Sequence, residues 1–244
     1  MQPINIGSRR ELFIDDYLIA AMRDVRLDLK KPERREAFAF DAPWEDNVAA
    51  PDSVVVDKDI VRLYYRAAID DLRDEVGSTV TALLESTDGG RSFVRPKLGL
   101  YEFKGSRDNN IIGRGLANSG TPPPVFIDRN PDCKINERYK GLEGVPGSNI
   151  YNCRLFAKCS ADGIHWRFMQ DEPLVYPGIF DTINTGFWDS IAGCYRSYTR
   201  DYRIREARGA KFNVRIIQSA TSSDFIHWTR PVDNRYADGE EDVQ

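Results

Sequence analysis

The sequence has 244 residues, of which 41% are hydrophobic and 30% charged. This balance is typical of a folded globular chain and argues against a disordered or fibrous one. Lys and Arg number 34 against 38 Asp and Glu, for a net charge of −4, so no basic excess is available to bind a nucleic acid or an anionic membrane.

The first predicted strands precede a Ser-x-Asp motif at Ser86 and Asp88. Runs rich in β-branched and aromatic residues occupy 53–56, 61–67 and 79–85, and turn residues separate them. Phe93 follows the motif, and we expect it to lie on a fourth short strand. These runs together predict one antiparallel four-stranded unit.

The same order recurs twice. Runs at 124–127, 138–142 and 152–158 precede Ser160-Ala-Asp162 and Trp166, and runs at 185–188, 194–199 and 212–218 precede Ser222-Ser-Asp224 and Trp228. No long segment has the 3.6-residue period of an amphipathic helix. The sequence therefore predicts an all-β fold.

The repeated Ser-x-Asp motif has a structural interpretation. Ser and Asp side chains can accept hydrogen bonds from the amides of a tight turn, glycine supplies a positive φ, and the following aromatic residue packs between neighbouring units. We expect these residues to hold the units together rather than to touch a substrate.

Four strands in each repeat, with Ser-x-Asp motifs 74 and 62 residues apart, are typical of a β-propeller. We expect a five-bladed propeller, of which this chain supplies three blades and the start of a fourth as an N-terminal fragment. In this single partial domain residues 1–40 would complete the last blade, and uncovered blade faces would promote self-association. The expected blades are 47–95, 118–168 and 180–230, with the fourth starting at 239–244.

The cysteines and histidines exclude several kinds of site. Four cysteines have neither zinc-ligand spacing nor the density of a disulfide framework, and we expect free thiols. The two histidines, His165 and His227, occupy the same position of the repeated motif, which argues against a Ser-His-Asp triad or a multi-histidine metal site. No apolar run resembles a signal peptide or a spanning helix, so we expect a cytoplasmic protein.

Several segments resemble a group of bacterial glycosyl hydrolase-like proteins, similar to the five-bladed propeller clan of invertases, arabinanases and xylosidases. The resemblance covers nearly the whole chain, and members of the group are longer. The segments that carry it are Arg10–Ile19, Pro43–Glu45, Tyr64–Arg66, Asp108–Ile111, Asn130–Cys133, Glu137–Lys140, Phe180–Asp181, Phe187–Asp189 and the two Ile-His-Trp sequences.

The resemblance implies catalytic carboxylates at the starts of inner strands. Asp52 matches the blade-one carboxylate that acts as base or nucleophile. The chain departs from the clan in blade two, where Pro124 stands in place of an Asp, and in blade three, where Asp181 and Asn184 stand near the expected acid Glu. Glu241, with its neighbour Glu240, is a further acid candidate at the head of the fourth blade.

The expected substrate contacts surround these carboxylates. Trp44 and Trp188 could stack on a sugar ring, and Glu45 and Asp46 would lie at the pocket rim, with Asn184 as a further polar contact. Arg66 and Arg200, each at the end of a second strand, could face a polar pocket, although arginines at such positions are more often solvated. No cofactor is expected, and the sequence leaves open a cation on the propeller axis.

The leading hypothesis is a glycoside hydrolase that cleaves a glycan with one protonated and one ionised carboxyl group. Pro124 and the missing blade-three Glu motivate an alternative, a carbohydrate-binding or structural propeller without turnover. A third, sialidase-like hypothesis rests on Ser86, Asp88, Gly90 and Phe93, which match the Asp box of that superfamily. It requires an arginine cluster around a carboxylate.

Overall fold

The computed structural model divides the chain into two compact units, residues 1–36 and 37–244. The described residues are 4–7, 12–13, 15–36, 38–45, 48–68, 79–114, 124–146, 153–207 and 210–234. The described residues of the first unit form turns and bends and contain no strand. That residues 1–40 complete a blade stays a prediction.

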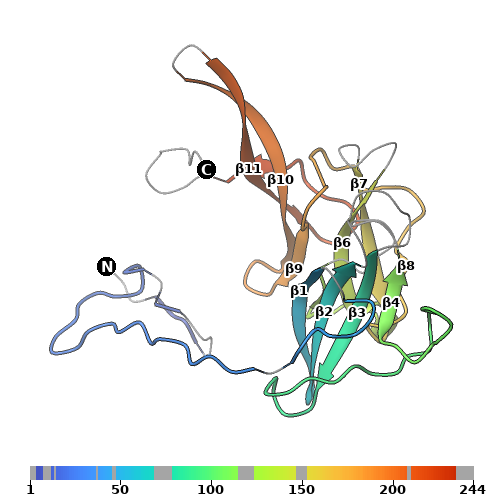
Figure 1. Ribbon diagram of the computed structural model, residues 1–244. Coiled ribbons are helices and arrows are strands. Elements are labelled where there is room, and N and C mark those ends of the chain that lie inside the picture. Colours follow the sequence, from blue (N-terminus) through green and yellow to red (C-terminus); the bar gives the residue numbers. More distant parts are fainter. Residues whose placement is uncertain are drawn as a thin grey trace. The chain divides into compact units, whose positions relative to one another are not determined.

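The second unit is all-β, as predicted, and its described residues form three four-stranded antiparallel sheets. The first sheet has the order β1 (Val48–Asp57), β2 (Ile60–Ala68), β3 (Thr79–Ser86) and β4 (Ile111–Arg114). Each strand pairs with the next one in the sequence (Figure 1). Two residues connect β1 to β2, since antiparallel neighbours need only a tight turn, whereas 24 residues separate β3 from β4.

The fourth strand of the first sheet lies later in the chain than the position of Phe93 suggests. Val94 forms only an isolated bridge with Glu85, and β4 begins at Ile111. The amide group of Asn110 donates to the Leu83 carbonyl at 2.8 Å and to the Tyr65 hydroxyl at 2.9 Å. These buried hydrogen bonds hold the beginning of β4 against β3.

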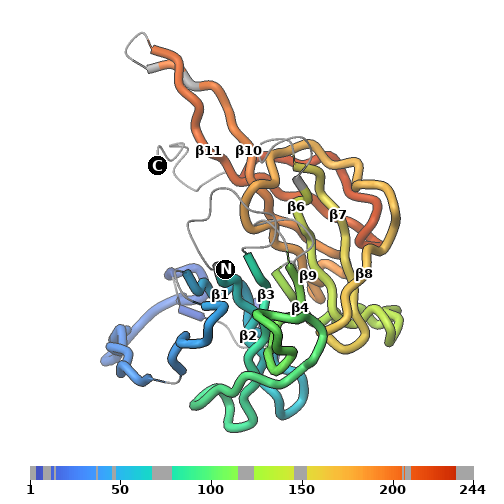
Figure 2. The backbone as a smooth tube through the Cα atoms, turned by 45° about the vertical axis from the view of Figure 1, so that its right-hand side comes forward, coloured from blue at the N-terminus to red at the C-terminus, as the bar shows by residue number. Residues whose placement is uncertain are grey.

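The other two sheets repeat the meander. The second sheet contains β5 (Phe126–Ile127), β6 (Tyr139–Pro146), β7 (Cys153–Ser160) and β8 (Arg167–Phe168), with a 3₁₀ turn, η1 (Ile135–Glu137), before β6. The third sheet contains β9 (Thr185–Asp189), β10 (Cys194–Ala207), β11 (Ala210–Ser222) and β12 (Val232–Asp233). The β10–β11 hairpin extends past the other strands of its sheet (Figures 1 and 2).

Hydrophobic clusters join the three sheets. One cluster lies between the first and second sheets around Tyr64 and Tyr139, and another lies between the second and third sheets around Leu142 and Phe225. A further cluster covers the other face of the first sheet, where Trp44 packs against Phe103. The first strands β1, β5 and β9 also contact one another in chain order. Among the described residues, no helix is long and apolar enough to span a bilayer.

The two junctions between sheets share one polar arrangement. At the first, the Tyr139 hydroxyl donates to Asp57 and accepts a hydrogen bond from Arg62 at 3.1 Å. At the second, the Tyr195 hydroxyl donates to Asp128 at 2.6 Å and accepts one from Lys140 at 3.0 Å. An Asp and a cation of one sheet thus hold the first tyrosine of the second strand in the next sheet.

The three Ser-x-Asp motifs form similar turns. In the second, the Ser160 hydroxyl accepts from the Gly163 amide at 2.8 Å, and the Asp162 carboxylate accepts from the His165 amide at 2.8 Å. Both Asp162 and His165 are exposed, and the His165 ring lies 2.8 Å from that carboxylate. The histidines therefore belong to turns that end a strand.

Candidate functional site

Asp52 lies at an irregularity in β1. The register of β1 against β2 shifts between Pro51 and Ser53, and such bulges turn a side chain away from the regular alternation. The Asp52 carboxylate accepts from Nε of Arg66 at 2.8 and 3.1 Å, and only 9% of its side chain is exposed. Arg66 comes from β2, so the two strands of one hairpin build this ion pair.

Asp181 lies in the loop before β9 and forms an ion pair with Arg200 of β10. The buried amide of Asn184 holds this loop, since it donates to the carbonyls of Phe180 at 3.2 Å and Thr182 at 2.8 Å. Nε of Arg200 is buried and has no hydrogen-bond partner among the described residues. Asp181 therefore holds the guanidinium group of Arg200, whose Nε donor makes no hydrogen bond to a described residue.

Arg66 and Arg200 occupy equivalent positions in their sheets. Val61 and Tyr195 lie opposite the serines of the Ser-x-Asp turns, Ser86 and Ser222. Arg66 follows Val61 by five residues, and Arg200 follows Tyr195 by five. Of the two expected environments, solvent and a polar pocket, solvent is wrong, since each arginine pairs with a carboxylate and is largely covered. The pairing of the strands makes them equivalent, because in the sequence Arg66 precedes Ser86 by 20 residues and Arg200 precedes Ser222 by 22.

The second sheet has glycine at this position. Tyr139 lies opposite Ser160, and Gly144 follows it by five residues. A Cβ atom at 144 would overlap the carbonyl oxygen of Phe180, so the backbone before Asp181 fills the place that an arginine has in the other two sheets. Burial raises the pKa of Cys153 in β7, and the negative charge of Asp181 adds to that increase. Asp181 therefore lies against the second sheet.

Glu45 and Trp44 are both buried in the second unit. The Glu45 carboxylate accepts from the Tyr65 hydroxyl at 2.5 Å and pairs with Arg95 at 2.5 Å, and its side chain is buried. Trp44 is buried against Phe103.

In the third sheet, Trp188 packs edge-on against Tyr195 with ring centroids 4.9 Å apart.

The structure brings Asp181 and Asn184 into one loop and places Asp52 in a separate pair. Asp46 and Glu241 lie outside the described residues. Within the described ranges, no three His, Cys, Asp or Glu side chains are grouped so as to hold a metal ion.

No protein-family model and no curated protein matches the chain. Solved structures that are similar to it include the following three. A structure named glycoside hydrolase has a TM-score of 0.48 at 14% identity over 80% of this chain and 61% of that one. A structure named as an RGII complex has a TM-score of 0.46 at 13% identity, over 80% of this chain and 61% of that one.

The third is an N-acetylgalactosamine deacetylase from F. plautii in complex with blood group B trisaccharide, with a TM-score of 0.45 at 15% identity. That match covers 81% of this chain and 56% of the deacetylase. The chain thus spans between 56% and 61% of the length of these three structures.

Proposed function

We propose that the protein is a glycoside hydrolase built on a five-bladed propeller, with Asp52 as the carboxylate that attacks the anomeric carbon or activates water. The observation that supports this assignment is the equivalence of the Asp52–Arg66 and Asp181–Arg200 pairs in two sheets. The Asp52 carboxylate lies at the bulge within β1 and the Asp181 carboxylate in the loop before β9, and both pairs are partly shielded from solvent.

The arginine partners suggest how the roles divide. Glycoside hydrolysis needs one ionised carboxylate and one carboxyl group that donates a proton to the leaving oxygen. A neighbouring guanidinium suits a carboxylate that works in its ionised form. We therefore assign Asp52 to nucleophile or base and Asp181, with Arg200, to the sugar hydroxyls. The proton donor is then assigned to Glu241.

The test is hydrolysis of a panel of aryl glycosides and oligosaccharides by the 244-residue chain and its Asp52→Asn variant. We expect turnover of one substrate class, lost in the variant, while the unfolding temperature changes little. Asp59→Asn is the matched control, since Asp59 lies exposed on the turn of the same hairpin. Retained turnover in Asp52→Asn would contradict the assignment.

A second candidate is carbohydrate binding without turnover. The second sheet favours it, because Pro124 stands where the clan has an Asp and Gly144 leaves no room for an arginine. Under this alternative, calorimetry detects saccharide binding that Asp181→Asn weakens, and no hydrolysis appears over days. A sialidase-like reaction is less well supported, since among the described residues Asp52 and Asp181 each pair with one arginine.

A further inference from the structure

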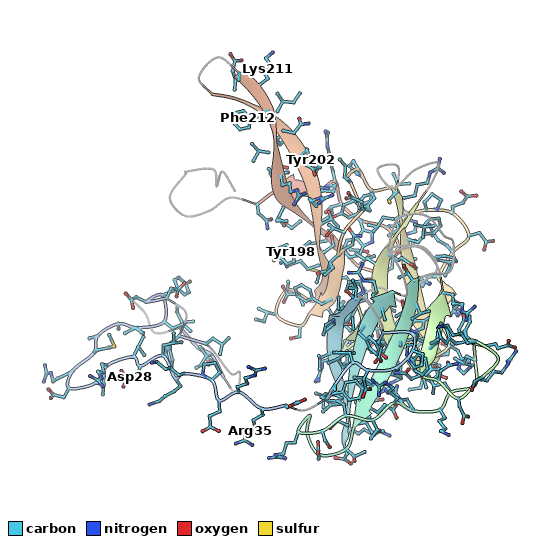
Figure 3. All side chains as sticks on the ribbon, viewed as in Figure 1. Asp28, Arg35, Tyr198, Tyr202, Lys211 and Phe212 are labelled. Carbon is cyan, nitrogen blue, oxygen red and sulfur yellow. The ribbon has the colours of Figure 1, made fainter. Side chains whose placement is uncertain are left out.

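The third sheet has one face that no described residue of another sheet covers. Tyr198 of β10 lies on this face and is 36% exposed, and Figure 3 shows it on the side of the sheet away from β6 and β7. Its ring stacks on Phe187 with centroids 6.1 Å apart. The residues of this face occupy the same register positions as the residues that the first and second sheets bury at the two junctions.

This face carries two of the three polar groups found at each junction, the Asp and the cation. Asp189 ends β9 as Asp57 ends β1, and Asp128 directly follows β5. One oxygen of Asp128 accepts from the Asn130 amide in its own turn, and the other binds Lys140 and the Tyr195 hydroxyl.

Asp189 makes the same two kinds of contact, to the amides of its own turn and to a cation. One of its oxygens accepts from the amides of Ile191 at 3.0 Å and Ala192 at 3.1 Å, and the other lies 3.3 Å from Nε of Arg196. Arg196 holds the register position of Arg62 and Lys140. Within the described chain no tyrosine hydroxyl joins this pair, which is 21% and 31% exposed.

The apolar part of each junction matches a large residue with a small one. At the first, Tyr64 of β2 faces Gly163, and its hydroxyl donates to the Gly163 carbonyl at 3.0 Å. At the second, the smaller Leu142 packs in one cluster with Phe225, which takes the place of Gly163 in its turn. Tyr198 holds the same register position as Tyr64 and Leu142 and is large. It therefore requires a glycine opposite.

We propose that this face binds a further four-stranded sheet of the same repeat, whose second strand begins with a tyrosine and whose Ser-x-Asp turn carries glycine. The tyrosine hydroxyl would donate to Asp189 and accept from Arg196. The first sheet of a second copy does not fit, because Val61 stands at its tyrosine position and has no hydroxyl. This inference concerns assembly and does not depend on catalysis.

The second sheet of this chain is a suitable probe, since it carries Tyr139 and Gly163 and already docks on the first sheet. We would attach a second copy of residues 124–179 after Gln244 and measure hydrogen exchange and urea unfolding. We expect the attached copy to be protected from exchange. Asp189→Asn should then lower the urea midpoint of the extended chain by clearly more than that of the 244-residue chain, where it removes only the charge paired with Arg196.

A size swap tests the apolar part separately. Gly163→Phe in the attached copy should abolish its protection, and adding Tyr198→Leu should restore it, because Leu142 accommodates Phe225 in the same way. The proposal is wrong if the attached copy exchanges like an unfolded chain, or if Asp189→Asn destabilises both chains equally. It is also wrong if the 244-residue chain sediments as a dimer that Tyr198→Leu dissociates, since a second copy then occupies the face.

Discussion

The ammonium group of Lys140 lies 2.7 Å from the carboxylate of Asp128, and the two side chains are only 4% and 0% exposed. Burial opposes the charge on Lys140, but its hydrogen bonds to Asp128 and Tyr195 outweigh that cost and raise its pKa above the ordinary value. Both side chains belong to the second sheet, and together they hold the Tyr195 hydroxyl of the third sheet inside the interface.

Removal of one partner of this pair should be costly. Asp128→Asn leaves the Lys140 charge buried without a counter-ion, and we expect the free energy of unfolding to fall by about 3–5 kcal/mol. Urea unfolding followed by tryptophan fluorescence measures this change. Asp132→Asn is the control, since Asp132 is exposed in the adjacent turn, and it should have little effect. Equal effects of the two substitutions would contradict the proposed role of the pair.

Gly163 is required for two separate reasons. Its φ is +76°, and a Cβ atom would lie 2.5 Å from the Tyr64 hydroxyl oxygen. Gly193 has a φ of +66° with no atom within 4 Å of the added Cβ, so Gly193→Ala measures the backbone cost alone. We expect about 1–2 kcal/mol of destabilisation for Gly193→Ala from its left-handed conformation. Gly163→Ala should cost about 1–3 kcal/mol more from overpacking.

A Tyr64→Phe background provides the test of that extra cost. Loss of the hydroxyl should reduce the penalty of Gly163→Ala, and thermal unfolding of the double variant measures the coupling. Additive effects of the two substitutions would mean that the tyrosine hydroxyl does not cause the strain.

Acid should weaken the first junction. The guanidinium of Arg138 holds the pKa of Asp57 well below its usual 3.8, with help from Tyr139 and against the effect of burial. A depressed folded-state pKa contributes stability that is present above the unfolded value and is lost as pH falls below it. We therefore expect the free energy of unfolding to decrease below about pH 4.

The Asp57→Asn variant isolates this contribution. It should be less stable than the wild type at pH 7, and its stability should fall less between pH 4 and pH 2, because one titrating group is gone. Urea midpoints measured across this range give the comparison. Parallel pH profiles for the two proteins would exclude Asp57 as a source of the acid sensitivity.

Arg66 should act as a positioning residue for Asp52. Arg66→Lys keeps the positive charge but loses the Nε donor that holds both carboxylate oxygens. On the proposed function, we expect kcat to fall by about a hundredfold, as for a small misplacement of a reacting group. KM and the unfolding temperature should change little. A change in KM alone would assign Arg66 to substrate binding.

The sequence by itself determined the three repeats and the antiparallel strands of each sheet. Strand periodicity and the Ser-x-Asp turns depend on short-range interactions, such as the Ser160 hydroxyl with an amide three residues later. The sequence also identified Asp52 and Asp181 as candidates through the resemblance. It placed the last strand of the first sheet near Phe93, because it gave no sign that Asn110 would hold β4 against β3.

The tertiary structure alone decided which charges meet. Asp128 and Tyr195 are 67 residues apart in the chain, and their hydrogen bond exists only because two sheets pack in one register. The same register makes Arg66 and Arg200 equivalent and leaves Gly144 against Phe180. Local propensity contains no information on such pairs, since each partner belongs to a different strand and their distance is set by packing between strands and sheets.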